Sequence, residues 1–342
     1  MKFVITIVAA TLLPTLVHSA TPDPKVDHTA VADRILAVLD DQFATFRDEA
    51  AVLADQSQAF CAGETPRSAV DAALASTWIA WAPLDAYQFG PIEAQSAALA
   101  VNFFPDKKNF VGRALKGLLK RPNAEQADPK IVAASSVGSQ GLPAIERLLY
   151  DDLQTCPALV GVSGNLARIG VDLYDGWFAP GGWGDLVRNA GPENPVYLSH
   201  QEFTRQIFTA LDFSILRLKQ HRIGRPLGTY ERSFPKSAEA WRSGLTNDIM
   251  LAQLQGISDI VDRGFAGAIF NPSRAWIVKV VADTQARVNA IGAPLAEAMG
   301  DPIKRVRAEG LQTKLDFLQL QLDQDIGPGL DVETGFSAGD GD

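Results

Sequence analysis

The chain has 342 residues, of which 31 are Lys or Arg and 40 are Asp or Glu, giving a formal charge of −9 at pH 7. This acidic balance argues against nucleic acid as a partner. The 46% of hydrophobic residues is enough for a sizeable core, and the length favours two domains.

The first twenty residues are typical of a signal peptide. Lys2 precedes an apolar run, Phe3–Val17, and the stretch ends in Ser19 and Ala20, which are small enough for signal peptidase. The run is too short for a spanning helix, and no cysteine sits at the cleavage point to accept a lipid. We therefore expect residues 1–20 to be removed and the mature protein to be periplasmic and not membrane-spanning. The alternative is an uncleaved anchor.

Apolar residues then recur at helical spacing, which predicts an all-α fold. Between Met250 and Val261, and again between Leu311 and Leu322, they are separated by 4, 3 and 4 residues. Strand patterns are sparse. Besides the 311–322 stretch, the expected helices cover approximately residues 28–60, 66–89, 92–101, 109–120, 143–151, 158–177, 199–222, 236–263 and 272–297.

Glycine, proline and tryptophan between Gly176 and Pro195 interrupt this periodicity. We expect a domain boundary there, between an N-terminal helical bundle at 21–180 and a C-terminal helical bundle at 195–330. An irregular loop within one bundle is the alternative. Residues 331–342 end in a polar, acidic stretch and are predicted to be a disordered tail.

Cys61 and Cys156 are the two cysteines of the chain. An oxidising compartment favours a structural disulfide between them, and two buried free thiols are the alternative.

The segment Ser135–Asp151 contains a polar loop followed by a helix entry. Pro143 suits the first turn of a helix because its missing N–H would have no partner there. Glu146 then projects near the start of that helix, with an apolar face around it.

This segment resembles the imelysin-like family (peptidase M75, iron-regulated protein A-like), in the branch that reads Gly-Leu-Pro-Ala-x-Glu where imelysin has Gly-x-His-x-x-Glu. Four further short blocks match in the family's order: Trp78–Pro91, Asn102–Asp106, Arg225–Gly228 and Ala240–Leu245. The resemblance implies two helical domains with the motif near their junction, and an association with iron-uptake machinery. It also marks the motif residues Gly141, Pro143 and Glu146 and the block residues Gly90 and Pro91 as site candidates.

A metallopeptidase needs more ligands than this motif offers. In the family's His form, His and Glu at i and i+3 can bind one metal ion, but Pro143 has no donor atom. Beyond the signal peptide the histidines are His28, His200 and His221. The last two lie on one predicted helix, roughly 32 Å apart at 1.5 Å per residue, so they cannot share a metal. We therefore lean against an enzyme, although M75-type hydrolysis stays an alternative.

An oxygen-rich site for iron or another divalent metal is a second possibility. Glu146 and Glu93, with Asp85 and Asp106, could supply its ligands if the fold brings them together. Alternatively, Glu146 only complements the positive end of its helix.

Several polar residues could bind a ligand or serve the fold. Arg225, Arg242 and Ser243 could hold an anion, or Arg242 could pair with Glu146. Ser136, Ser139 and Gln140 could line a pocket or cap the helix at Pro143. Trp78 and Trp81 usually indicate core and less often a ligand cleft.

Together, these patterns predict a periplasmic, non-catalytic component that binds a small ligand or a metal ion and is associated with iron uptake. The alternatives are an M75-type metallopeptidase and a surface-polysaccharide or protein-interaction module.

Overall fold

The computed structural model describes residues 25–151, 153, 156–229 and 231–335. The expected signal peptide (1–20) and residues 336–342 lie outside these residues. Within the described ranges every regular element is a helix and no strand occurs, which confirms the all-α prediction. No helix of the described chain is both long and apolar enough to cross a bilayer.

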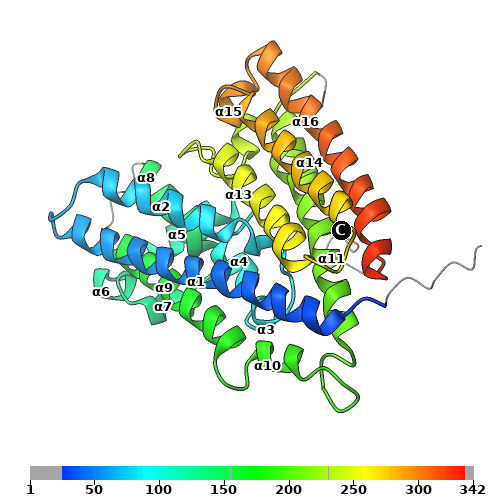
Figure 1. Cartoon of the computed structure of the whole chain (residues 1–342). Coiled ribbons are helices and arrows are strands. Elements are labelled where there is room, and N and C mark those ends of the chain that lie inside the picture. Colours follow the sequence, from blue (N-terminus) through cyan, green and yellow to red (C-terminus); the bar gives the residue numbers. More distant parts are fainter. Residues whose placement is uncertain (1–24, 152, 154–155, 230, 336–342) are drawn as a thin grey trace, which may run out of the picture.

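The helices gather in two groups (Figure 1). The first group consists of α1 (His28–Cys61), α2 (Arg67–Trp81), α3 (Pro91–Ala94), α4 (Ala97–Val101), α5 (Phe110–Leu118), α6 (Asn123–Gln126), α7 (Pro129–Ala133), α8 (Gly141–Tyr150), α9 (Cys156–Phe178) and α10 (Trp183–Arg188). The second consists of α11 (His200–Leu216), α12 (Arg225–Leu227), α13 (Thr246–Asp259), α14 (Asn271–Asn289), α15 (Leu295–Ala298) and α16 (Pro302–Gln321).

Three π-helical segments extend the second group. They are η3 (Arg217–Gly224), η5 (Ile260–Gly264) and η6 (Leu322–Ile326), and each continues a preceding α-helix. Short 3₁₀ turns occur at η1 (Leu84–Ala86), η2 (Val137–Ser139), η4 (Pro235–Ser237) and η7 (Pro328–Leu330).

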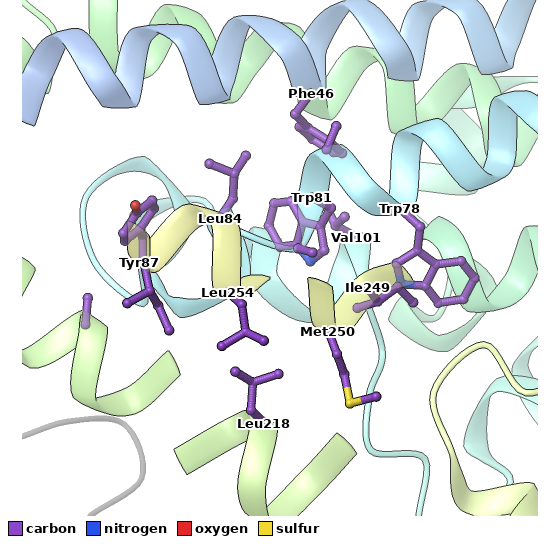
Figure 2. Close-up of a cluster of buried hydrophobic side chains, with 14 of the residues drawn as sticks. Phe46, Trp78, Trp81, Leu84, Tyr87, Val101, Leu218, Ile249, Met250 and Leu254 are labelled. Atoms are coloured by element: carbon purple, nitrogen blue, oxygen red, sulfur yellow. The ribbon is translucent and has the colours of Figure 1, made fainter. Parts of the chain in front are cut away.

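One hydrophobic cluster runs through both groups. Figure 2 shows Trp81 next to Phe46, and Trp78 beside Ile249 of α13. Trp78 and Trp81 are 1% and 0% exposed, as expected of core residues. The expected boundary at 176–195 contains the end of α9 and all of α10, and the division into two domains stays a prediction.

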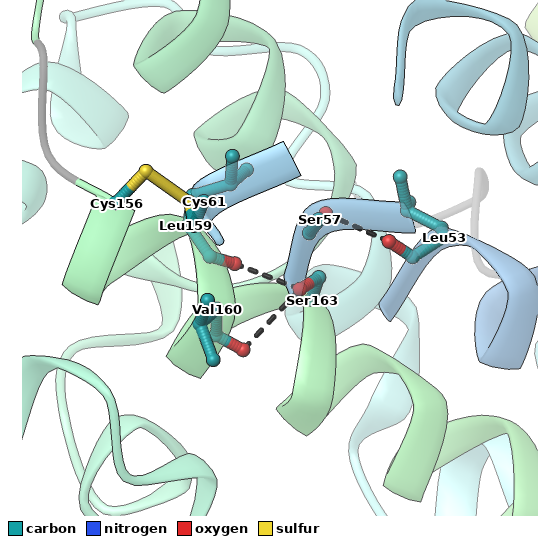
Figure 3. The surroundings of a disulfide bond; sticks show 7 residues. All are labelled: Leu53, Ser57, Cys61, Cys156, Leu159, Val160 and Ser163. Atoms are coloured by element: carbon teal, nitrogen blue, oxygen red, sulfur yellow. Dashed lines mark hydrogen bonds between the residues drawn. A yellow bond between two sulfur atoms is a disulfide. The ribbon is translucent and has the colours of Figure 1, made fainter. Parts of the chain in front are cut away.

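The disulfide between Cys61 and Cys156 is present, with a Cα–Cα distance of 5.4 Å (Figure 3). It joins the end of α1 to the start of α9, two long helices that pack along each other. The bond closes a sequence separation of 95 residues. By the chain-entropy relation, this closure stabilises the fold by roughly 4–5 kcal/mol.

Several predicted boundaries are wrong. The helix expected at 66–89 ends at Trp81, because Pro83 cannot donate the next helical hydrogen bond. The helix expected at 236–263 begins as α13 only at Thr246, and the one expected at 272–297 ends at Asn289. The predicted disordered tail also starts too early, since Val332 is buried and the Gly335 N–H donates to Thr209.

Candidate functional site

Helix α8 carries the motif and packs tightly at its start. Gly141 has φ +67°, and a Cβ there would collide with the carbonyl oxygens of Ala100 and Val101. Only glycine allows α8 to begin against α4 in this way. Pro143 then occupies the first turn, as predicted, and lines a cavity of about 300 Å³.

Glu146 lies in the second turn of α8 and is 3% exposed. Its Oε1 accepts hydrogen bonds from the backbone N–H of Arg242 at 3.1 Å and of Ser243 at 2.9 Å, and from Ser243 Oγ at 2.8 Å. The second carboxylate oxygen, Oε2, lies 3.8 Å from Arg242 NH1. The expected pairing with Arg242 is therefore present. The expected interaction of Glu146 with the start of its own helix is wrong, because the carboxylate faces another segment.

The partner segment, residues 238–245, is a series of turns and not the predicted helix. Ala240 and Gly244 have φ of +49° and +76°, in the left-handed region that a continuing helix excludes. The N–H groups of Arg242 and Ser243 are consequently free of helical carbonyls and donate to Glu146. The Glu146 carboxylate thus organises a turn that lies 96 residues further along the chain.

Burial raises the pKa of Glu146, against the hydrogen bonds from Ser243 and the charge of Arg242, which lower it. Arg242 is shared, because its Nε also donates to Asp151 Oδ1 at 2.5 Å. Arg147 lies 3.8 Å from the same Asp151 carboxylate. The two arginines and two carboxylates form a compact, largely neutral cluster.

We call the hollow beside this cluster the Glu146 cavity. Its walls come from both helix groups: Trp78, Phe103, Phe104, Asp106, Asn109, Val111, Pro143, Glu146, Arg147, Arg225, Lys236, Ser237, Ala238, Glu239, Ala240, Trp241 and Arg242. Of the candidate residues, the fold brings Trp78, Asp106, Pro143, Glu146, Arg225, Arg242 and Ser243 to this region.

A second charged cluster lies fully inside the protein and was missed by sequence reasoning. Arg222, which is 0% exposed, donates from Nε to Glu239 Oε2 at 2.6 Å and from NH2 to Asp85 Oδ2 at 2.8 Å. Arg217 NH2 lies 2.7 Å from the same Asp85 oxygen. We call these four residues the buried ion network. Burial alone would raise the pKa of Asp85, but Arg217 and Arg222 outweigh it and the pKa is lowered.

Neutral side chains complete this network. Glu239 Oε1 accepts from Trp78 Nε1 at 3.2 Å and from Asn102 Nδ2 at 2.7 Å. Arg222 NH1 donates to Gln253. Three of these residues, Trp78, Asp85 and Asn102, belong to two of the sequence blocks that carried the resemblance, and Glu239 directly precedes a third, Ala240–Leu245. The position of these residues in or beside the resembling blocks was the feature of the sequence that could have pointed to the buried ion network.

The expected metal ligands do not assemble. Glu93 is exposed on α3, Asp85 is held by two arginines, and Asp106 accepts from the N–H groups of Phe110 and Val111 at 2.6 and 3.1 Å. In the part of the chain that is described, no three His, Cys, Asp or Glu residues are placed to hold an ion. The donor set around Glu146 therefore does not fit the metal ion that the family's motif implies.

Other candidates lie away from the Glu146 cavity. Gln140 Nε2 donates to the carbonyls of Ala133 and Ser135, both at 3.2 Å, and Ser139 Oγ donates to Ser136. None of these side chains caps α8. Their role is to hold the turn before the helix.

Gly90 and Pro91 likewise serve the fold. Gly90 has φ +61°, and a Cβ on it would lie only 2.9 Å from the nearest carbon of the Trp177 ring. Pro91 begins α3. His200 and His221 stay apart, as expected, at the start of α11 and within η3.

Comparison with known proteins identifies the family. A family model described as Imelysin (peptidase M75) matches residues 40–322. An imelysin-like protein from Psychrobacter arcticum 273-4 is similar in structure, with a TM-score of 0.74, 20% identity, and coverage of 92% of this chain and 100% of that chain. An iron-regulated protein A precursor from Parabacteroides distasonis has a TM-score of 0.70, 15% identity, and coverage of 89% and 97%. None of the curated proteins matches the chain. Because the family model covers most of the sequence, the chain belongs to the imelysin family.

Proposed function

We propose that this imelysin-family protein is an exported, non-hydrolytic binding component that works in iron acquisition and holds its ligand in the Glu146 cavity. The observation that carries the proposal is the state of Glu146. Its Oε1 is occupied by three donors from Arg242 and Ser243, and Pro143 stands where the Gly-x-His-x-x-Glu motif, which this segment resembles, would have its histidine.

This arrangement favours binding over hydrolysis. A zinc hydrolase site needs three protein ligands and an open position for an activated water. Glu146 instead accepts hydrogen bonds from within the chain, and Arg242 competes with any cation for its second oxygen. The cavity, however, is of the size and mixed polar–apolar character typical of small-ligand sites.

The iron connection and the location are supported by the family and by the N-terminus. A similar structure is named as an iron-regulated protein A precursor. Residues 1–20 have the basic, apolar and small-residue order of a signal peptide. The charged cavity wall also favours an ionic ligand over a neutral polysaccharide, which argues against the interaction-module alternative.

The test is a proteolysis assay with mature protein and an unfolded substrate, with and without Zn²⁺ or Fe²⁺ and with chelator. We expect no chelator-sensitive cleavage, and the same background rate for wild type and Glu146→Ala. Cleavage that requires metal and disappears in Glu146→Ala would establish the metallopeptidase instead. A matched control is Glu93→Ala, which removes an exposed carboxylate that does not line the cavity.

The physiological part is tested in the native cell. We expect the protein in the periplasmic fraction, shortened by approximately the first 20 residues, and more abundant under iron limitation. Mass spectrometry of the purified N-terminus gives the cleavage point. An abundance that does not respond to iron would contradict the assignment to iron acquisition.

A further inference from the structure

The Glu146 cavity has an uneven distribution of unpaired charge. Its three acidic residues are all engaged: Asp106 by backbone N–H groups of α5, Glu146 by Ser243 and Arg242, and Glu239 by Arg222. A bare cation would therefore have to compete with these internal hydrogen bonds or, at Glu146 Oε2, with the charge of Arg242 at 3.8 Å.

The basic residues of the cavity are in a different state. Arg147 and Arg242 are compensated by Asp151 and Glu146 together. Arg225 is not: its Nε is buried with no hydrogen-bond partner, and among the described residues no carboxylate pairs with it. Lys236 likewise has no acidic partner within the described chain, and its Nζ lies 5.4 Å from the Trp241 ring centre.

A buried guanidinium N–H without an acceptor is costly, since desolvation is not offset by a hydrogen bond. An anion in the cavity would supply that acceptor. Arg225 begins α12 and Lys236 lies in η4, so the two cations reach the cavity from different segments. Converging cations of this kind are suited to a ligand with more than one negative oxygen.

The remaining walls limit the size and shape of the ligand. Phe103, Phe104 and Trp241 supply apolar surface, and the volume of about 300 Å³ is at the lower end for ligand sites. A small, compact anion fits this space.

We propose that the Glu146 cavity binds a small oxyanion with two or more negative charges, a polycarboxylate or phosphate, through Arg225 and Lys236. Iron then enters the site only as the complex of such an anion and not as a bare cation. The binding of iron as such a complex rests on the proposed function, whereas the anion site rests on the geometry alone.

The experiment is isothermal titration calorimetry of the mature protein at constant ionic strength. The probes are citrate, inorganic phosphate, ferric citrate, and ferrous chloride without oxygen, with sodium chloride as the salt control. We expect saturable binding of citrate or phosphate, and the comparison of these two arms tells the carboxylate source from the phosphate source. Ferric citrate should bind at least as tightly as the tighter of the two anions.

Variants separate the cavity from general surface charge. The double variant Arg225→Gln/Lys236→Gln should lower the affinity for the anion by at least about tenfold, since it removes both uncompensated cations. Arg232→Gln removes an exposed cation that lies over Phe234 and does not line the cavity, and should leave the affinity unchanged. Circular dichroism verifies that each variant is folded.

Three results would overturn the inference: no binding of either anion, equal affinity in the double variant, or tight binding of ferrous ion that is lost in Glu146→Gln. None of them depends on proteolysis. Chelator-sensitive cleavage would instead remove the proposed function while this titration still decides the anion site.

Discussion

The buried ion network and the Glu146 cavity both join distant parts of the chain through arginine, yet they differ in what their charges face. In the network, Arg222 is enclosed and bound on all sides by Asp85, Glu239 and Gln253. At the cavity, Arg225 lies only three residues further along the chain and has a buried Nε with no partner.

The difference teaches how to tell a structural charge from a binding one. A fully compensated buried group stabilises a particular packing, and its removal damages the fold. An uncompensated group beside a cavity costs stability in the free protein and recovers it when a ligand arrives. Burial alone does not separate these cases, because both arginines have buried nitrogen atoms.

The largest effect should come from Arg222→Met. It leaves Asp85 and Glu239 buried without their shared cation, so we expect a loss of about 3–5 kcal/mol in the free energy of unfolding, measured by urea denaturation. Arg263→Met is the control, because it breaks an exposed ion pair with Asp41 and should cost under about 1 kcal/mol. Equal losses in the two variants would contradict a structural role for the network.

The second largest effect should be that of Glu146→Ala, which we expect to lower the free energy of unfolding by about 2–3 kcal/mol. The reason is that the N–H groups of Arg242 and Ser243 lose their acceptor. Glu146→Gln keeps an acceptor oxygen, and its free energy of unfolding should stay within about 1 kcal/mol of wild type.

Because burial raises the pKa of Glu146, the ionised form is disfavoured in the folded protein. The stability of the Gln variant relative to wild type should therefore improve as pH rises above 4.5, and a pH series of denaturation curves checks the sign.

His221 of η3 is influenced by arginines of both regions: its pKa is lowered to about 4 by burial and by the charges of Arg217, Arg225 and Arg222. Its neutral form is favoured in the folded protein. Its contribution to stability is present above pH 6.5 and is lost as pH falls towards 4. His221→Gln should remove that part of the acid destabilisation, on the order of 1–2 kcal/mol after solvent screening. Parallel wild-type and variant curves between these pH values would contradict it.

The smallest effect should be that of Arg225→Gln. If the cavity cation costs stability in the free protein, this variant should unfold at the same urea concentration as wild type or higher, within about 1 kcal/mol. Added citrate should then stabilise wild type and not the variant. A loss comparable to that of Arg222→Met would place Arg225 with the structural arginines.

Local signals in the sequence predicted much of the first helix group. Helix α8 was expected because Pro143 suits a first turn, and the disulfide because an oxidising compartment was expected for Cys61 and Cys156. The pairing of Arg242 with Glu146 was among the expected possibilities, and both residues were singled out on their own motif blocks.

What failed depended on contacts between distant segments. The turns at 238–245 read as helix, since the left-handed backbone of Ala240 is not visible in residue type. Arg222 and Glu239 were passed over because charges within a helical pattern usually indicate a solvated face, and only the assembled fold shows that they are enclosed.

The π-helical segment η3 has a consequence for the evolution of this chain. Arg217 and Arg222 are five positions apart, and in an α-helix they would point about 140° away from each other. The i to i+5 repeat of a π-helix brings such residues back onto one side, where both guanidinium groups contact a single oxygen of Asp85. Deleting one of the four residues between them would restore ordinary winding with the two arginines at i and i+4, about 40° apart and still on one side of the helix. A loss of one residue in this segment should therefore preserve the shared contact with Asp85, whereas replacing either arginine removes it.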